Sequence, residues 1–206
     1  MKFYEGMFIL HNAEVAEGET VGAPEEIVRG LIEKSSGVVA HTLIWANRKL
    51  AYPIASRQTG TYVLAYFSGE ADTCKHLNRE VAIHDRCLRH AAFAIEALPE
   101  AEALPGPLTE PTARMPRRME EGMEGDVGMP AALDIGLGEP GEGDEKEKKL
   151  HESLDYKNVY VLRRLITSQG KLYSRIRSNL HAKHQRQLRK AVLRARVLAL
   201  LPFVAR

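Results

Sequence analysis

The chain has 206 residues, of which 44% are hydrophobic and 27% are charged, a composition typical of a globular protein. No apolar run approaches the roughly 18 residues of a membrane span, and the apolar stretch 7–10 is too short for a signal peptide, so the sequence predicts neither. The net charge of +2 is the sum of −2 over residues 1–98, −7 over 99–150 and +11 over 151–206. This uneven distribution argues against a single domain and indicates a nucleic-acid partner at the basic end.

The first 98 residues are predicted to fold as an α+β domain. Strands are expected over 3–11, 38–46, 61–67 and 86–97, because β-branched, aromatic or alternating residues fill them. One helix is expected to begin at Pro24 and to end at Gly37, and a second to span 71–84. The order β-α-β-β-α-β predicts a ferredoxin-like fold, one antiparallel sheet with two helices on one face. This fold serves many functions and assigns none.

Residues 99–150 are predicted to be a disordered acidic linker. They hold 7 of the 10 prolines and 8 of the 16 glycines, and they contain no aromatic residue. Such a segment cannot bury enough apolar surface to offset the entropy of ordering it.

Residues 151–206 are predicted to form a small basic all-helical module. A helix over 155–168 should end at Gly170, followed by a basic loop over 171–179 and a second helix over 182–200. A cationic helix face beside a cationic loop is typical of proteins that bind the phosphates of a nucleic acid, and Tyr173 could stack on an unpaired base. The predicted RNA-binding residues are Lys171, Arg175, Arg177, Lys183, Arg186, Arg189, Lys190, Arg194 and Arg196.

The N-terminal domain resembles bacterial small-subunit ribosomal protein six. The resemblance rests on YEGMFIL at 4–10, RKLAYPI at 48–54, G-x-Y at 60–62 and the run L-N-R-E-x-x-I-x-D-x-x-L-R-H at 77–90. It implies a ferredoxin-like protein that pairs with ribosomal protein eighteen on the platform of the small subunit.

The C-terminal module resembles that partner, small-subunit ribosomal protein eighteen. The motifs are DYKNV at 155–159, VLRR at 161–164, R-x-R-S-x-L-x-A-K-x-Q-R at 175–186 and RARVLALLPF at 194–203. The basic loop departs from the family pattern, because Ser174 and Ile176 replace a proline and an arginine that are common there. We expect the loop to make one fewer phosphate contact as a result.

Because the two families are partners, the chain looks like a fusion of two neighbours in the ribosome. The resemblance implies a non-enzymatic constituent of the small ribosomal subunit in the cytoplasm, bound to the central domain of small-subunit ribosomal RNA and to neighbouring ribosomal proteins. No cofactor, metal, membrane or small-molecule substrate is expected. The two domains are expected to pair in cis through Arg48, Leu50, Tyr52, Tyr156, Leu193 and Val197. An alternative is a translational repressor that binds messenger RNA off the ribosome.

Other functions receive less support from the residues. A metal site would have to combine residues whose spacing matches no C-x-x-C pattern, namely Cys74, His76, His84, Cys87 and His90. A thiol nucleophile at Cys87 would need His84 or Asp85 as a base, but neighbouring strand residues point to opposite faces. Two further open alternatives are a base-stacking platform and a second set of RNA or partner contacts. The platform would use the aromatic residues Trp45, Tyr62, Tyr66 and Phe67, which could equally be core residues. The second set of contacts would use Arg48, Lys49 and Arg57, whose side chains could equally be solvated.

Overall fold

The computed structural model describes residues 1–11, 23–100, 104–106, 108, 154–178 and 180–204. The chain divides into two compact units, unit 1 (Met1–Glu110) and unit 2 (Pro111–Arg206), which are described separately. The predicted linker over 99–150 lies almost entirely outside the described residues. Its disorder therefore remains a prediction.

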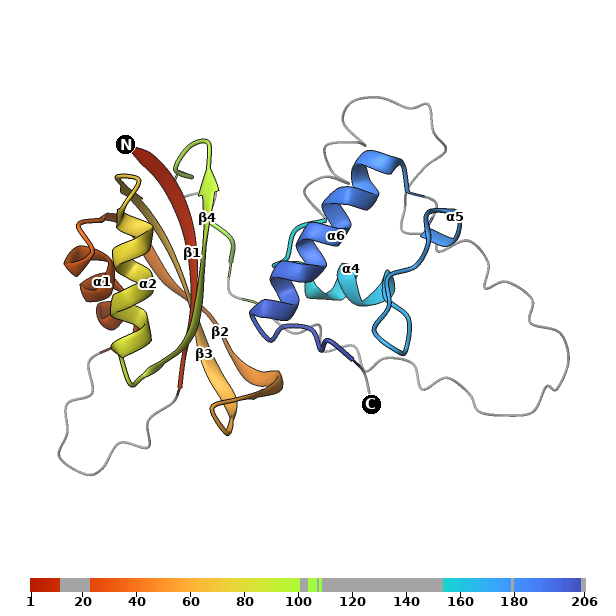
Figure 1. The fold of residues 1–206 in the computed structure, drawn as a ribbon, viewed down its shortest axis with the longest axis horizontal. Helices are drawn as coiled ribbons and strands as arrows, with labels where there is room; N and C mark the ends of the chain where they lie inside the picture. The colour runs from red at the N-terminus through yellow and green to blue at the C-terminus, as the bar shows by residue number, and fades with distance from the viewer. Residues whose placement is uncertain (12–22, 101–103, 107, 109–153, 179, 205–206) are drawn as a thin grey trace, which may run out of the picture. The chain divides into compact units, whose positions relative to one another are not determined.

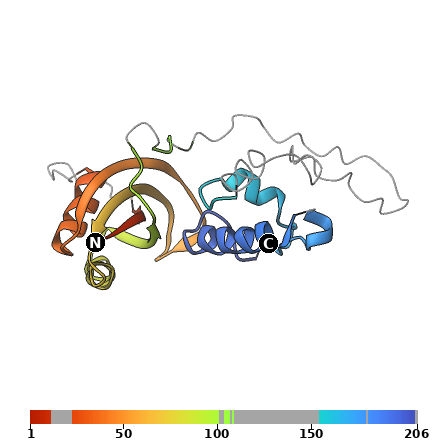
Figure 2. The same ribbon diagram turned by 90° about the horizontal axis from the view of Figure 1, so that it is seen from above.

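Unit 1 is a four-stranded sheet with two helices on one face (Figures 1 and 2). Its elements are β1 (Lys2–Leu10), α1 (Pro24–Lys34), β2 (Val38–Ile54), β3 (Arg57–Gly69), α2 (Thr73–Ile83) and β4 (Cys87–Ile95). The strand order is β2-β3-β1-β4, and every neighbouring pair is antiparallel. The predicted ferredoxin-like α+β fold is confirmed.

The core between sheet and helices follows from the two periodicities in the sequence. On β1, alternate residues Tyr4, Phe8 and Leu10 belong to this core, and the Tyr4 ring stacks on Phe67 of β3 at a centroid distance of 5.4 Å. The helices contribute residues at helical spacing, which are Val28, Leu31, Ile32, Leu77 and Val81. Apolar burial on this scale is what holds the two helices on the sheet.

The other face of the sheet is also buried at its centre. Met7 and Ile9 of β1 are fully buried, and the hydroxyl of Tyr66 on β3 donates a hydrogen bond to the buried carboxylate of Glu5 at 2.9 Å. The backbone N–H of Leu108 donates to the carbonyl of Trp45 on β2 at 2.7 Å. The strongly apolar run at 7–10 is therefore explained by a strand whose side chains are buried on both faces.

Two strands are longer than predicted. The prediction ended them early because the turn between them lacks the residues that usually mark a tight hairpin. β2 continues past Ala46 through the LAYPI motif to Ile54, and β3 already begins at Arg57. The chain reverses at Ala55 and Ser56, which have φ values of +46° and +65°. Such left-handed pairs usually carry Asn-Gly or Asp-Gly, so this hairpin had no sequence signal.

The C-terminal end of α1 also differs from the prediction. The left-handed residue is Ser36, with φ +60°, and not Gly37. The N–H of Ser36 donates to Glu33 and the N–H of Gly37 donates to Ile32, which are the two bonds of a Schellman cap. Gly37 is required for space, because a Cβ there would lie 2.7 Å from Cγ2 of Ile32.

The described residues of unit 2 include the short helices α4 (Val159–Arg164) and α5 (Arg175–Ser178) and the longer helix α6 (Ala182–Val197), with α4 lying beside α6 (Figure 2). The predicted helix over 155–168 is wrong at both ends. After α4 the chain turns, and Ile166 pairs with Leu172 in an isolated β-bridge around Gly170, whose φ is +83°. Nor does α6 reach Leu200, because Ala199 is left-handed with φ +51°.

Candidate nucleic-acid interface

One face of α6 is cationic and exposed, while the other is apolar and buried. The buried side consists of His184, Leu188, Ala191, Val192 and Ala195, at the spacing expected of an amphipathic helix. The cations on the exposed side are Lys183, Arg186, Arg189, Lys190 and Arg194. The five predicted cations therefore share one solvent-facing surface, which we call the basic face.

The basic loop carries three more exposed cations, Lys171, Arg175 and Arg177, the last two on α5. Ile176 stands between these arginines with 88% of its surface exposed. An apolar side chain so exposed makes no contribution to the core of unit 2.

The loop is fastened to α6 by Gln185. The Nε2 of Gln185 donates to the carbonyl of Tyr173 at 2.9 Å, and its Oε1 accepts a hydrogen bond from the hydroxyl of Ser178 at 3.0 Å. Ser178 is buried, and its N–H donates to the carbonyl of Ser174 at 2.9 Å. Both ends of α5 are therefore tied to the helix that carries the basic face.

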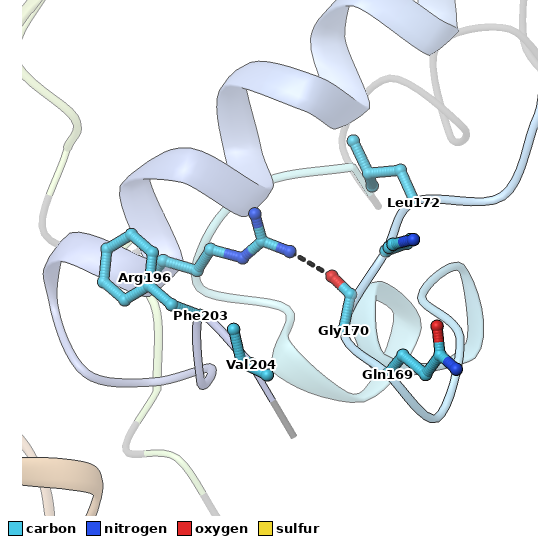
Figure 3. Close-up of a pocket in the computed structure, with 7 residues that line it drawn as sticks. Gln169, Gly170, Leu172, Arg196, Phe203 and Val204 are labelled. Atoms are coloured by element: carbon cyan, nitrogen blue, oxygen red, sulfur yellow. Dashed lines mark hydrogen bonds between the residues drawn. The ribbon is translucent and has the colours of Figure 1, made fainter. Parts of the chain in front are cut away.

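Arg196 differs from the other eight predicted RNA-binding residues, because it is half-buried and makes contacts within unit 2. Its Nη2 donates to the carbonyl of Gly170, and its guanidinium carbon lies 6.0 Å from the centroid of the Phe203 ring (Figure 3). These residues line a cavity of about 490 Å³ together with Gln169, Lys171, Leu172 and Val204. Arg196 thus joins the turn at Gly170 to the segment after α6.

Sequence reasoning missed a further exposed group on α4. Tyr160 is 52% exposed, and Arg163 and Arg164 follow it at spacings of three and four residues, which places the three on one side of the helix. An exposed aromatic ring beside two guanidinium groups suits both stacking on a base and binding a phosphate. The spacing itself was the signal that could have identified this group.

The charges of this region have few local counterparts. Residues 151–206 contain 13 lysines and arginines against two acids. Asp155, the acid that the structure describes, pairs with Nζ of Lys157 at 3.3 Å. The basic face and the basic loop therefore project a positive potential, which attracts polyanions.

The residues expected at the pairing surface lie in different environments. Leu50 and Tyr156 are buried, Arg48 is half-buried, and Tyr52 accepts a hydrogen bond from Nη1 of Arg89. In unit 2, Leu193 and Val197 are exposed by 47% and 44%, next to the cations of the basic face. Their role in pairing the two domains stays a prediction.

The geometry gives no support to a thiol nucleophile at Cys87. Burial raises the pKa of the Cys87 thiol to about 12, so the thiol stays protonated at neutral pH and is a poor nucleophile. Cys74 packs against the core between sheet and helices, and both cysteines are free.

The base-stacking platform and the metal site also lack support among the described residues. Trp45, Tyr62, Tyr66 and Phe67 are all at most 3% exposed, which places them in packing positions. Within the described ranges, no three His, Cys, Asp or Glu residues are grouped so that they could hold a metal ion. The helices among these residues are all too short or too polar to cross a membrane.

Two separate segments of the chain match two ribosomal protein families. The family described as Ribosomal protein S6 matches residues 3–94, and the family described as Ribosomal protein S18 matches residues 150–201. The chain is 37% identical over 96 residues to small ribosomal subunit protein bS6 of Clostridium botulinum (strain Loch Maree / Type A3), covering 47% of this chain and all of that one. It is 37% identical over 90 residues to bS6 of Clostridium perfringens (strain SM101 / Type A), covering 44% and 93%.

A solved structure also matches, the crystal structure of 30S ribosomal protein S6 from Thermotoga maritima. It has 26% sequence identity and a TM-score of 0.38, and the match covers 46% of this chain and 87% of that one. Ribosomal proteins of the S6 and S18 families are structural and not enzymatic. The chain belongs to the bS6 family of small ribosomal subunit proteins, and in the same polypeptide it carries a segment that matches the family described as Ribosomal protein S18.

Proposed function

We propose that this chain is a structural constituent of the small ribosomal subunit in which two neighbouring ribosomal proteins are joined in one polypeptide. In this proposal the chain binds the central domain of small-subunit ribosomal RNA, at the platform. The observation that carries the RNA-binding part is the basic face of α6 beside the basic loop, exposed and almost without local acids. RNA phosphates are the polyanions that such a surface fits within a ribosome.

In this proposal unit 2 makes most of the phosphate contacts. The arginines of the basic face and the basic loop present planar, bidentate donors that match phosphate oxygens. The group on α4 supplies a further contact, with Tyr160 stacking on an unpaired base and Arg163 and Arg164 holding the adjacent phosphates. Arg196 contributes indirectly, by holding the turn at Gly170 in place.

Unit 1 serves as the scaffold on which unit 2 docks. Its first 98 residues carry 10 lysines and arginines against 12 acids, and this lack of excess positive charge suits a protein-binding role better than a phosphate-binding role. Joining partners in one chain raises their effective concentration to the order of millimolar without adding any contact. The fusion therefore favours pairing in cis during assembly of the subunit, in the cytoplasm.

The RNA-binding part is tested by removing two charges from the basic face of the full chain. Arg186→Ala combined with Lys190→Ala should weaken binding to a transcript of the rRNA central domain about tenfold or more, and should reduce the slope of log affinity against log salt concentration by about two. Fluorescence anisotropy over a salt series measures both quantities.

A matched control variant comes from unit 1. Lys34→Ala with Arg79→Ala removes the same charge from exposed positions on α1 and α2, and should change neither the affinity nor the slope appreciably. Equal losses in the two variants would mean that net charge alone governs binding. An unchanged slope in the unit 2 variant would remove the basic face from the interface.

A further inference from the structure

The basic loop is held against α6 at two separate points, by two side chains of that helix. Arg196, near the C-terminal end of α6, binds the carbonyl of Gly170, just before Lys171. Gln185, in the first turn of α6, binds the loop at Tyr173 and at Ser178. Because the side chain of Gln185 is neutral, replacing it tests the effect of the loop contact on RNA binding without changing the charge of the protein.

The amide of Gln185 uses its donor and its acceptor for the loop at the same time. Nε2 donates to the Tyr173 carbonyl at 2.9 Å while Oε1 accepts from the Ser178 hydroxyl at 3.0 Å. The two contacted residues flank Arg175 and Arg177 on either side. The side chain of Gln185 therefore links the two ends of the segment that carries these two arginines.

The segment between those contacts is too short to hold its own shape. α5 has four residues, and an isolated helix of this length is unstable in water because nucleation is unfavourable. Without a fastening to α6, Arg175 and Arg177 would sample many conformations and would lose that freedom on binding RNA. The fastening removes part of this entropic penalty before RNA binds.

Gln185 also sets the loop cations at a fixed place relative to the basic face. It adjoins Arg186 in sequence, and Lys183 and Arg189 lie within about one turn of it on the same helix. We propose that Gln185 is a positioning residue for RNA binding, which holds Arg175 and Arg177 in register with the cations of α6 so that both sets engage the phosphates together. This inference rests on the proposed function and deepens it.

The test is a double-mutant cycle in the full chain, with the rRNA central-domain transcript as the probe. Gln185→Ala alone should weaken binding about five- to tenfold and should reduce the salt slope, although it removes no charge. In a chain that already carries Arg175→Ala and Arg177→Ala, the same substitution should weaken binding less than twofold, because no loop cations remain to be positioned.

A second substitution probes the same contact from the other side. Ser178→Ala removes the hydroxyl that donates to Oε1 of Gln185 and should show a smaller loss with the same dependence on Arg175 and Arg177. Circular dichroism at the assay temperature verifies that each variant retains its helices. Alanine favours helix more than glutamine does, so α6 itself should persist in Gln185→Ala.

Each other result overturns the inference in a distinguishable way. An equal loss in both backgrounds, or an unchanged salt slope for Gln185→Ala, would show that Gln185 does not act through the loop arginines. If Arg175→Ala with Arg177→Ala has no effect while the Arg186 and Lys190 variant does, the positioning is wrong and the proposed function stands. If neither charge pair matters, the proposed function itself fails.

Discussion

The two units of this chain use their residues in opposite ways. In unit 1 the β1 residues Met7, Phe8 and Ile9 are fully buried, and the first 98 residues are close to charge balance. In unit 2, residues 151–206 carry 13 lysines and arginines against two acids, and the cations of the basic face and the basic loop are exposed. The comparison indicates that unit 1 supplies folding stability and unit 2 supplies the surface for a polyanion, so stability and RNA affinity should respond to different substitutions.

The largest effect expected on this comparison is a loss of stability in unit 1 alone. Leu77→Ala on α2 removes a fully buried side chain from the core and should reduce the free energy of unfolding of unit 1 by about 2–5 kcal/mol. Trp45, the single tryptophan and buried in unit 1, reports this transition by its fluorescence during urea unfolding.

The same variant should leave RNA affinity unchanged at temperatures where both units remain folded. Arg79→Ala, at an exposed position of the same helix, is the control and should change stability by no more than about 0.5 kcal/mol. A parallel loss of RNA affinity in Leu77→Ala would break the separation between the two units.

The next effect is a gain of affinity in unit 2. Ile176→Arg places an arginine at an exposed position between Arg175 and Arg177, and should increase the salt slope of RNA binding by about one and the affinity several-fold. Stability should stay within about 0.5 kcal/mol, because Ile176 contributes nothing to the core.

Ile83→Arg provides the matched comparison in unit 1. Ile83 is 70% exposed at the end of α2, so the chemical change is identical and the surroundings are those of the other unit. No gain in affinity is expected there. Equal gains in the two variants would show that any added positive charge strengthens binding, wherever it lies.

The smallest effect is a pH dependence confined to unit 1. His90 on β4 stacks on Phe8 with ring centroids 5.7 Å apart, and burial lowers the pKa of its imidazole. The unfolded chain therefore takes up a proton on this residue at a higher pH than the folded chain does. Stability of unit 1 should be fully present above about pH 6.5 and should decrease as the pH falls below it, by at most about 1.4 kcal/mol per pH unit.

His90→Phe keeps the ring contact with Phe8 and removes the titration. Urea unfolding followed by Trp45 fluorescence at a series of pH values should show a flatter profile for this variant. An identical slope in the two proteins would mean that other groups account for the acid sensitivity.

Most of the fold of unit 1 could be predicted because its elements follow simple periodicities. Alternation on β1 and helical spacing at Val28, Leu31 and Ile32 identified the core residues. The extension of β2 and β3 to a tight turn was missed because Ala55 and Ser56 adopt left-handed conformations that usually belong to glycine or asparagine. Tertiary pairing of two long strands overrides this local preference.

Unit 2 was harder to predict than unit 1. The apolar residues Leu165 and Ile166 extend the helical pattern of α4, yet the chain leaves the helix because Ile166 pairs with Leu172 across the turn at Gly170. The amphipathic pattern of α6 correctly predicted which side is cationic and exposed. It could not identify Gln185, because a side chain that binds backbone carbonyls and hydroxyls leaves no periodic signal.

The most direct test of the account is sedimentation of a cell lysate through a sucrose gradient, with antibodies against both ends of the chain. Both ends are expected to sediment with the small ribosomal subunit, on a single band of full length. Two shorter bands in that peak would contradict a lasting role for the fusion. Both ends at the top of the gradient would contradict the ribosomal function itself.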